Sequence, residues 1–256
     1  MKISVCGKGG SGKSTIVSLL AREAQSRGYH VLVVDSDESN TGLFRILGFD
    51  QPPIPLMELV GGKKSLKEKM SQPNVLTEAA IPIERIPAPY LMDRNGLTLV
   101  SIGKILQSLE GCACPMGVLS REFLKKLTLK ADELAIVDME AGVEHFGRGV
   151  ETSIDSVLIV VEPSFESLDV AERVHGLAVG IGIKNVWAIL NKMPSEEITT
   201  KLDGELKKKG IDVIGCIHLD SKVFQSGIEG SAISTERAAE EMRDVLDCLL
   251  SRANLI

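Results

Sequence analysis

The residues with the clearest capacity for chemistry form a glycine-rich loop near the N-terminus. Residues 7–15 read Gly-Lys-Gly-Gly-Ser-Gly-Lys-Ser-Thr and follow a short apolar run at residues 3–6. The spacing G-x-x-x-x-G-K-[ST] is typical of a phosphate-binding loop, in which glycines allow successive backbone N–H groups to point at phosphate oxygens. A helix-like run at residues 15–27 follows, and a helix N-terminus adds positive potential at the same place. The alternative is an ordinary glycine-rich turn.

The side chains of this loop predict separate roles. Lys13 can reach the outer phosphates as a point charge, and Ser14 can offer its hydroxyl to a magnesium ion. The backbone of the loop supplies the other contacts. The predicted phosphate-binding residues are therefore Gly9, Gly10, Ser11, Gly12, Lys13, Ser14 and Thr15.

A second lysine inside the loop, Lys8, gives the form K-G-G-x-G-K-S. In this form the loop resembles the deviant phosphate loop of P-loop NTPases that include nitrogenase iron protein, the MinD and ParA ATPases and several metal-centre maturation factors. The resemblance implies a nucleotide-dependent homodimer in which Lys8 crosses the interface and touches the partner's nucleotide, a catalytic role alongside Lys13. The alternative is a solvated loop lysine.

Bulk composition narrows the class of protein. The 256 residues carry a net charge of −6, and 44% of them are hydrophobic, which is enough for a substantial core. A negative balance disfavours non-specific nucleic-acid binding, and no apolar run has the length of a membrane span. Met1 leads directly into a strand pattern, and five cysteines, an odd number, indicate a reducing compartment. We expect a cytoplasmic protein with no nucleic-acid or membrane partner.

Short apolar runs alternate with helical patterns along the chain. Several runs are apolar on both faces, as in strands that helices cover on each side of a parallel sheet. The alternation predicts an α/β fold with a doubly wound, mostly parallel sheet and helices on both faces, forming a single domain over residues 1–256. The predicted strands are residues 2–6, 30–35, 97–102, 134–138, 157–161, 185–190 and 213–217, and the predicted helices are residues 14–27, 120–129, 167–180, 196–209 and 234–252.

One segment departs from the alternation. Residues 49–96 contain seven of the ten prolines and no long periodic run. We interpret this segment as a proline-rich insertion with little regular structure, which packs beside the sheet or over the nucleotide and is not a second domain.

Two predicted strands end in carboxylates at the edge of the sheet where the phosphate loop lies. The second strand ends in Asp35-Ser36-Asp37, and a carboxylate at this point can orient a water molecule on a terminal phosphate. The resemblance to the first switch of the deviant-loop family implies that Asp37 has this role and that Asp35 lies nearer the magnesium ion. Alternatively, the polar residues here cap a following helix, through Ser39 or Asn40. The apolar strand at residues 134–138 ends in Asp138, which predicts a second carboxylate on the magnesium side.

The segment that follows Asp138 is dense in glycine and charged residues. Gly142 can donate its N–H to a γ-phosphate and rotate when that group leaves, as the second switch does in the deviant-loop family that this chain resembles. Glu144 and His145 are a possible metal-ligand pair, although a salt-bridged loop is the commoner outcome.

The end of the strand at residues 185–190 predicts the base specificity. Relatives place a base-reading residue where Asn191 and Lys192 stand here. A guanine reader continues Asn-Lys-x-Asp, whereas Met193-Pro194 follows in this chain, so adenine and therefore ATP or ADP are favoured. The loop at residues 217–220 is expected to form the other wall of the base pocket.

Two cysteines lie in a glycine- and proline-flanked loop at residues 111–117. Cys112 and Cys114 can point the same way in extended chain and bind one soft metal ion. One chain supplies two thiolates, and a two-fold dimer completes a four-thiolate site. The alternatives are a redox dithiol or two buried cysteines. Cys6, Cys216 and Cys248 fit core positions.

The complete set of motifs resembles the CooC-type accessory proteins, which serve nickel insertion into carbon monoxide dehydrogenase. The similarity extends over essentially the whole chain, and its motifs are at residues 8–15, 103–105, 111–115, 138–149 and 191–192. The resemblance implies a Mg²⁺-dependent ATPase that dimerises with nucleotide and holds Ni²⁺, or Zn²⁺ at the same site, through Cys112 and Cys114 of both subunits. The implied partner is the carbon monoxide dehydrogenase apoprotein.

Other functions stay open at this point. A maturation factor for the related acetyl-CoA synthase is the nearest alternative. A MinD- or ParA-like spatial-organising ATPase leaves the two cysteines unexplained, and an iron–sulfur electron-transfer protein needs the same four thiolates. A nickel GTPase is disfavoured because the guanine-reading aspartate is missing.

Overall fold

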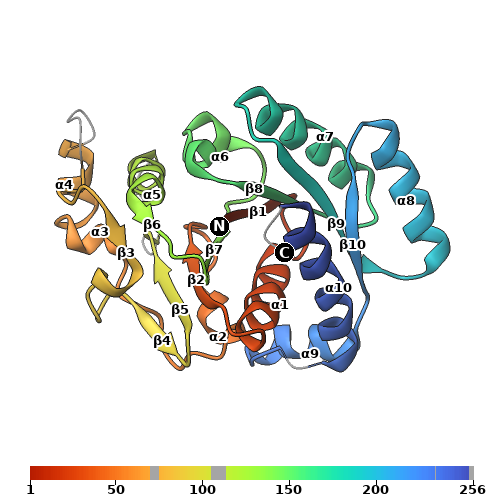
Figure 1. Ribbon diagram of the computed structural model, residues 1–256, viewed down its shortest axis with the longest axis horizontal. Coiled ribbons are helices and arrows are strands. Elements are labelled where there is room, and N and C mark those ends of the chain that lie inside the picture. The colour runs from red at the N-terminus through yellow and green to blue at the C-terminus, as the bar shows by residue number, and fades with distance from the viewer. Residues whose placement is uncertain (70–74, 105–113, 234, 254–256) are drawn as a thin grey trace.

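The computed structural model describes residues 1–69, 75–104, 114–233 and 235–253. Eight strands among the described residues form one sheet, and a short additional pair lies at its side (Figure 1). The strands are β1 (Lys2–Gly7), β2 (His30–Asp35), β3 (Ile81–Pro82), β4 (Met92–Arg94), β5 (Leu97–Ser101), β6 (Leu127–Thr128), β7 (Glu133–Asp138), β8 (Ser156–Val161), β9 (Asn185–Met193) and β10 (Val213–His218). The helices are α1 (Lys13–Ser26), α2 (Leu43–Ile46), α3 (Leu56–Leu59), α4 (Gly62–Lys69), α5 (Cys114–Lys126), α6 (Glu144–Gly147), α7 (Phe165–Gly180), α8 (Glu196–Lys208), α9 (Ser221–Glu229) and α10 (Glu236–Arg252), with 3₁₀ turns η1 (Ile83–Arg85) and η2 (Val150–Ser153).

The main sheet has the order β10-β9-β8-β1-β7-β2-β5-β4, and all its pairs are parallel except β4–β5. All seven predicted strands are present, so the predicted fold class is confirmed. β7 and β8 are buried along their whole length, which explains their continuous apolar sequences. The strand order reverses beside β1, and the loop that leaves its carboxyl end therefore lies at the topological switch point.

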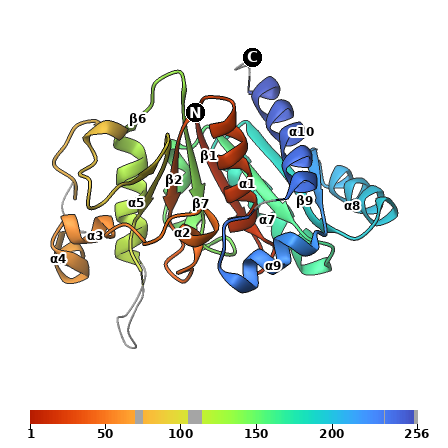
Figure 2. The same cartoon turned by 90° about the horizontal axis from the view of Figure 1, so that it is seen from below.

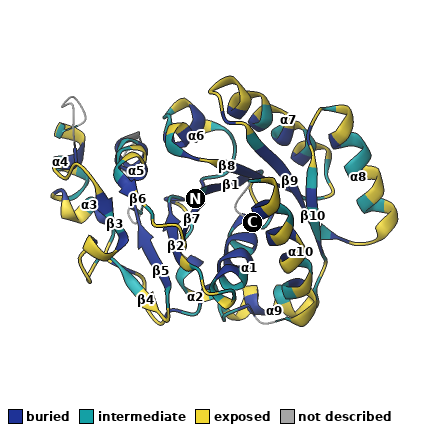
Figure 3. Ribbon diagram, in the orientation of Figure 1, coloured by how far each residue is buried: buried dark blue, intermediate teal, exposed yellow. Residues whose placement is uncertain are grey.

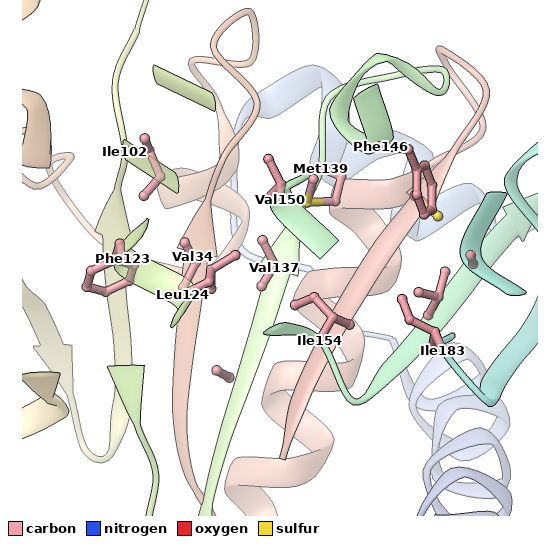
Figure 4. Close-up of a cluster of buried hydrophobic side chains, with 14 of the residues drawn as sticks. Val34, Ile102, Phe123, Leu124, Val137, Met139, Phe146, Val150, Ile154 and Ile183 are labelled. Atoms are coloured by element: carbon pink, nitrogen blue, oxygen red, sulfur yellow. The ribbon is translucent and has the colours of Figure 1, made fainter. Parts of the chain in front are cut away.

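Helices cover both faces of the sheet and create two apolar cores (Figures 2 and 3). α1 and α10 pack on one face, while α5 and α7 pack on the other. In the core on the side of α5 and α7, side chains of α5 contact those of β2, β7 and the chain that follows β7 (Figure 4). The labelled members are Val34, Ile102, Phe123, Leu124, Val137, Met139, Phe146, Val150, Ile154 and Ile183.

The structure differs from the predicted elements at several places. The helix expected at residues 120–129 begins at Cys114, because Pro115 is compatible with the first turn of a helix and apolar residues follow it. Cys114 is therefore helical rather than part of a loop. Helix α9 was not predicted. Residues 49–96 contain α3, α4, β3, η1 and β4, and β4 pairs with β5 through a hairpin at Asn95 and Gly96, both with positive φ.

Candidate nucleotide-binding site

The glycine-rich loop leaves the end of β1 and leads into α1. Gly12 is the N-cap of α1 with φ 93°, and no side chain caps the helix, so the first-turn N–H groups face the loop. A Cβ at Gly12 would overlap the side-chain nitrogen of Asn191, and one at Gly7 would lie 2.5 Å from the Val160 carbonyl oxygen. Glycine is required at both positions because the neighbouring strands approach the loop closely. The result is a compact cradle of backbone N–H groups.

The two lysines of the loop have different partners. Lys13 is buried, and its ammonium donates to the Lys8 carbonyl oxygen at 3.3 Å, closing the loop on itself. The ammonium of Lys8 lies 2.8 Å from Glu162 Oε1. Lys192 lies 3.0 Å from Glu162 Oε2 and also donates to the Gly10 carbonyl. The sequence analysis did not identify Glu162 as a residue of this site. Its sequence signal is an acidic residue directly after β8, a strand that pairs with β1.

Asp138 and Ser14 form the magnesium side of the site. The Ser14 hydroxyl donates to Asp138 Oδ2 at 2.7 Å and accepts from the Asn40 amide at 2.8 Å. Asp138 is fully buried, and its Oδ1 atom has no hydrogen-bond partner. Burial, with the nearby Asp35 carboxylate, raises the pKa of Asp138 to about 7. A hydroxyl beside a buried carboxylate with an unsatisfied oxygen fits a hard divalent cation such as Mg²⁺.

Asp35 lies next to Asp138 in the sheet, because β2 and β7 pair in register with these two residues opposite each other. Burial raises the pKa of Asp35 to about 6, although the Lys104 ammonium opposes the shift. Lys104 lies 2.7 Å from the Asp35 carboxylate and donates to the backbone carbonyls of Asp37 and Asn40. All three ammonium protons thus have acceptors. The sequence analysis gave Lys104 no role, since its partners are 64 to 69 residues away.

Asp37 closes the turn after β2. Its Oδ1 atom accepts from the Ser39 N–H at 2.9 Å, the Ser39 hydroxyl at 2.6 Å and the Asn40 N–H at 3.2 Å. This is a local turn and not a helix cap, because α2 begins at Leu43 without a side-chain cap. The carboxylate is buried near Asp35 and Asp138, at the same edge of the sheet.

The segment after β7 contacts the glycine-rich loop. Gly142, with φ 88°, donates its N–H to the Gly7 carbonyl at 3.1 Å. The His145 ring contacts the Gly142 carbonyl through Nε2 at 3.1 Å and Glu151 through Nδ1. Both ring nitrogens are therefore engaged within the chain. The Glu144–His145 metal option is wrong in this structure, because His145 is buried and Glu144 turns back to accept from the Val143 N–H.

A further charged cluster joins the turn after β2 (residues 36–40) to the segment after β7 (residues 139–149), which are referred to below as the two switch segments. Arg148 contacts Glu140 and lies 3.4 Å from Glu38 Oε1. Burial, followed by repulsion from Glu140, raises the pKa of Glu38 to about 7 despite the attraction of Arg148. The sequence showed only that this region is rich in charged residues. The pairing of Arg148 with Glu38 could not be predicted, because the two residues are 110 positions apart.

A cavity of about 410 Å³ opens beside the start of α1. Asn191 and Lys192 line it on one side, and the Asn191 amide also donates to the Ser11 carbonyl at 2.8 Å. The other wall comes from the end of β10 and from α9, including the exposed side chain of Phe224. The structure thus brings the predicted base-side residues together with the loop at residues 217–220, while α9 adds an apolar wall that the sequence analysis missed.

Comparison with known proteins agrees with this geometry. The family described as the CobQ/CobB/MinD/ParA nucleotide binding domain matches residues 3–233. The chain belongs to this family. Within it, an uncharacterized ATP-binding protein of Methanocaldococcus jannaschii is 42% identical over 254 residues, covering 97% of this chain and 99% of its own length. The carbon monoxide dehydrogenase accessory protein CooC of Rhodospirillum rubrum is 33% identical over 228 residues, covering 87% and 85%.

Solved structures of the family share the fold. The septum site-determining protein MinD of Pyrococcus horikoshii, complexed with Mg-ADP, superposes with a TM-score of 0.70 at 19% identity and covers 98% of each chain. The prediction of an ATPase is confirmed at the level of the family. In the described part of this family member, no helix combines the length and the apolar character that a membrane crossing requires.

The predicted thiolate site lies mostly outside the described residues. Cys112 lies outside the described residues, and Cys114 is described only as the first residue of α5. Elsewhere in the described chain, no group of three or more His, Cys, Asp or Glu side chains could hold a metal ion. Cys6 is buried, as expected, whereas Cys216 and Cys248 are only partly buried. The pair Cys112 and Cys114 therefore stays a prediction.

Proposed function

We propose that this protein is an ATP-dependent maturation factor that assists nickel insertion into carbon monoxide dehydrogenase. The observation that carries the proposal is the 33% identity to CooC over 87% of the chain. The Cys112-Ala113-Cys114 motif supports it, because a nucleotide switch alone gives no reason for two closely spaced thiols. We place the protein in the cytoplasm, without a nucleic-acid or membrane partner.

The nucleotide part of the proposal assigns roles to residues already described. Lys13 leaves the Lys8 carbonyl and binds the outer phosphates, while the amide nitrogens from Gly9 to Thr15 surround them. Ser14 and Asp138 would hold Mg²⁺, whose chemistry is to neutralise charge that develops on the phosphates. Asp37 orients the attacking water, and Gly142 gives up the Gly7 carbonyl to contact the terminal phosphate. The cavity between Asn191 and α9 accepts adenine.

The homodimer is the step that completes the metal site. Lys8 must exchange Glu162 for the partner's nucleotide, which is feasible because the Lys8 side chain is about one-third exposed. Two copies of the Cys112–Cys114 pair then supply four thiolates around one ion on the two-fold axis. Four thiolates suit Ni²⁺ in square-planar geometry and Zn²⁺ in tetrahedral geometry. Nickel is the cargo, and zinc is its competitor at the same thiolates.

The client is assigned from the same similarity. Acetyl-CoA synthase is the competing client. Reconstitution of each nickel-free apoenzyme with this protein, Ni²⁺ and ATP separates them, since only the true client should gain activity beyond Ni²⁺ alone.

The central test is anaerobic nickel binding measured without nucleotide, with ADP and with ATP. We expect about one nickel per dimer in the wild type, loss in Cys112→Ala/Cys114→Ala and a nucleotide-dependent affinity. Cys216→Ala is the matched control, because it removes a partly buried thiol elsewhere and should bind like the wild type. Unchanged binding in the double variant would refute the thiolate site.

A further inference from the structure

The peptide unit between Gly142 and Val143 is held by side chains at both of its polar groups. The Gly142 carbonyl lies 3.1 Å from Nε2 of His145, and the Val143 N–H donates to Glu144 Oε2 at 3.0 Å. Both side chains belong to α6, directly after this unit in the chain. Glu144 is exposed to water, whereas His145 is buried, so the contact of the carbonyl with the ring is the stronger restraint.

The preceding peptide unit, between Ala141 and Gly142, has fewer restraints. Within the described chain its polar groups make one hydrogen bond, from the Gly142 N–H to the Gly7 carbonyl at 3.1 Å. Gly142 has φ 88°, a region that glycine enters without steric cost. A joint change of ψ at Ala141 and φ at Gly142 therefore turns this unit alone. The Gly142 carbonyl stays in place during that rotation, because it belongs to the next planar unit.

The His145 ring is itself fixed by a buried carboxylate. Nδ1 contacts Glu151 in η2, and the two side chains are only 2% and 0% exposed. The Phe146 ring lies 4.8 Å from the His145 ring, centroid to centroid, and Phe146 and Val150 belong to the apolar core beside the pair (Figure 4). Close packing and the Glu151 contact together hold the ring in one orientation.

The two contacts of the ring determine how many protons the buried pair holds. Nε2 faces a carbonyl oxygen, which can only accept, so Nε2 must carry a proton. Nδ1 then either donates to the Glu151 carboxylate, as part of an imidazolium, or accepts from a protonated Glu151. Both arrangements place two protons on the pair and give it no net charge. A pair without net charge is the form in which burial of both groups costs least.

We propose that His145, oriented by Glu151, is a positioning residue that fixes the Gly142–Val143 peptide unit and confines rotation to the Ala141–Gly142 unit. The proposal rests on the proposed function in one respect, the transfer of the Gly142 N–H from the Gly7 carbonyl to the terminal phosphate. With the next unit fixed, that N–H is directed at one of these two acceptors. Loss of the Nε2–H donor frees further bonds to rotate, and the N–H is then poorly aligned with the phosphate. His145 acts through Gly142 and is not itself a catalytic residue.

The test uses variants that replace one ring nitrogen at a time. The amide of asparagine reaches the position of Nδ1, so His145→Asn keeps a donor to Glu151 and removes the donor to Gly142. The longer His145→Gln keeps a donor near the position of Nε2. The double variant His145→Asn/Glu151→Gln also removes the buried carboxylate, and the same comparison is made in it if His145→Asn does not fold. Each protein is assayed for steady-state ATP hydrolysis and, by calorimetry, for binding of Mg-ADP and of Mg²⁺ with a non-hydrolysable ATP analogue.

We expect His145→Asn to lower kcat roughly 10- to 100-fold, because a donor to the transferred phosphate is misaligned. Its affinity for the ATP analogue should fall roughly 10-fold, as expected for one hydrogen bond to a charged group. Its affinity for ADP should stay within about twofold of the wild type, because ADP has no terminal phosphate for Gly142 to contact. His145→Gln should recover most of the loss. A merely structural role of His145 would weaken ADP and the analogue alike.

His175→Asn is the matched control, because it makes the same replacement on α7, outside the segment after β7. It should match the wild type in all three measurements. The proton on Nε2 is checked by NMR of the ring nitrogens in protein labelled with ¹⁵N-histidine at neutral pH. The chain has four histidines, and the signals missing from the His145→Gln spectrum identify His145. We expect a protonated Nε2.

Several results would overturn the positioning role. They are an Nε2 without a proton, a kcat of His145→Asn within about twofold of the wild type, equal losses of affinity for ADP and for the analogue, and no recovery in His145→Gln. A wild type that binds the analogue no more tightly than ADP would refute the phosphate contact of Gly142 and this proposal with it. None of the measurements involves nickel, so a failed nickel titration would refute the proposed cargo and leave the role of His145 standing.

Discussion

Replacing Glu38 by glutamine tests whether burial or ion pairing controls the charged cluster beside the switches. Glu38 is only 5% exposed, and its partner Arg148 is shared with Glu140. Burial is the largest influence and raises the pKa of Glu38 from 4.5 to about 7. A carboxyl group whose pKa is raised by folding stabilises the fold in its protonated form, so its contribution is present below the unfolded pKa and is lost as the pH rises through the folded value.

The magnitude follows from the size of that shift. Each pKa unit corresponds to about 1.4 kcal/mol, and discounting the shift for solvent contact at the edge of the cluster leaves about 2 kcal/mol. The wild-type free energy of unfolding should therefore fall by about 2 kcal/mol between pH 4.5 and pH 7 through this group alone. Glutamine has nearly the same shape and no titration. Glu38→Gln should match the wild type within about 0.5 kcal/mol at pH 5 and exceed it by 1–2 kcal/mol, or roughly 2–8 °C in Tm, at pH 8.

The assay is urea unfolding of nucleotide- and magnesium-free protein at pH 5 and pH 8. Glu205→Gln is the control, because the Glu205 side chain on α8 is about 40% exposed and pairs with Lys208. If Glu38→Gln is less stable than the wild type at pH 8 and equal to it at pH 5, the attraction to Arg148 outweighs burial, and the reasoning is refuted.

Two further substitutions test the nucleotide site. Asp138→Asn removes the buried carboxylate that faces Ser14. The rate of Mg²⁺-dependent ATP hydrolysis should fall by roughly 100-fold or more, because charge stabilisation by a metal is worth several kcal/mol. A steady-state rate within tenfold of the wild type would contradict the role of Asp138 in holding magnesium. Gly12→Ala places a Cβ on the Asn191 side chain at a residue with φ 93°. We expect its free energy of unfolding in urea to fall by about 1–3 kcal/mol and its nucleotide binding, measured by calorimetry, to be lost. Gly28→Ala is the control, because Gly28 also has positive φ but lies in open space, so this variant should be destabilised and still bind nucleotide.

The sheet and the phosphate loop were predictable because local sequence determines them. Continuous apolar runs mark strands that are buried on both faces, and β7 and β8 are buried throughout. The glycine-rich loop encodes its own conformation through residues with positive φ. The proximity of the carboxylates at the ends of β2 and β7 was also predictable, because parallel strands end at the same edge of the sheet.

Other elements were missed although a local signal was present. The hairpin that adds β4 carries Asn95-Gly96, a strong turn signal that the proline-rich composition of residues 49–96 obscured. Helix α9 is amphipathic, but its apolar face, including Phe224 and Ile228, is exposed and lines a cavity instead of the core. Periodicity alone does not distinguish a short helix whose apolar face lines a binding cavity from a loop.

The charged partners of the site could not be predicted, because their pairing is a property of the fold. Lys104 and Asp35 are separated by 69 residues, and Lys8 and Glu162 by 154. No spacing rule connects such residues. What the sequence does show is that lysines and acidic residues are frequent after successive strands. The parallel sheet then brings those strand ends together.

The charged groups of the site leave room for a divalent cation without the loss of an ion pair. Asp35, Glu38 and Asp138 have pKa values raised to between about 6 and 7, so protons partly neutralise them when no cation is present. Lys104 and Arg148 supply fixed positive charge to the two switch segments, and neither occupies the unsatisfied oxygen of Asp138. A divalent cation at Ser14 and Asp138 therefore replaces protons and displaces no lysine or arginine.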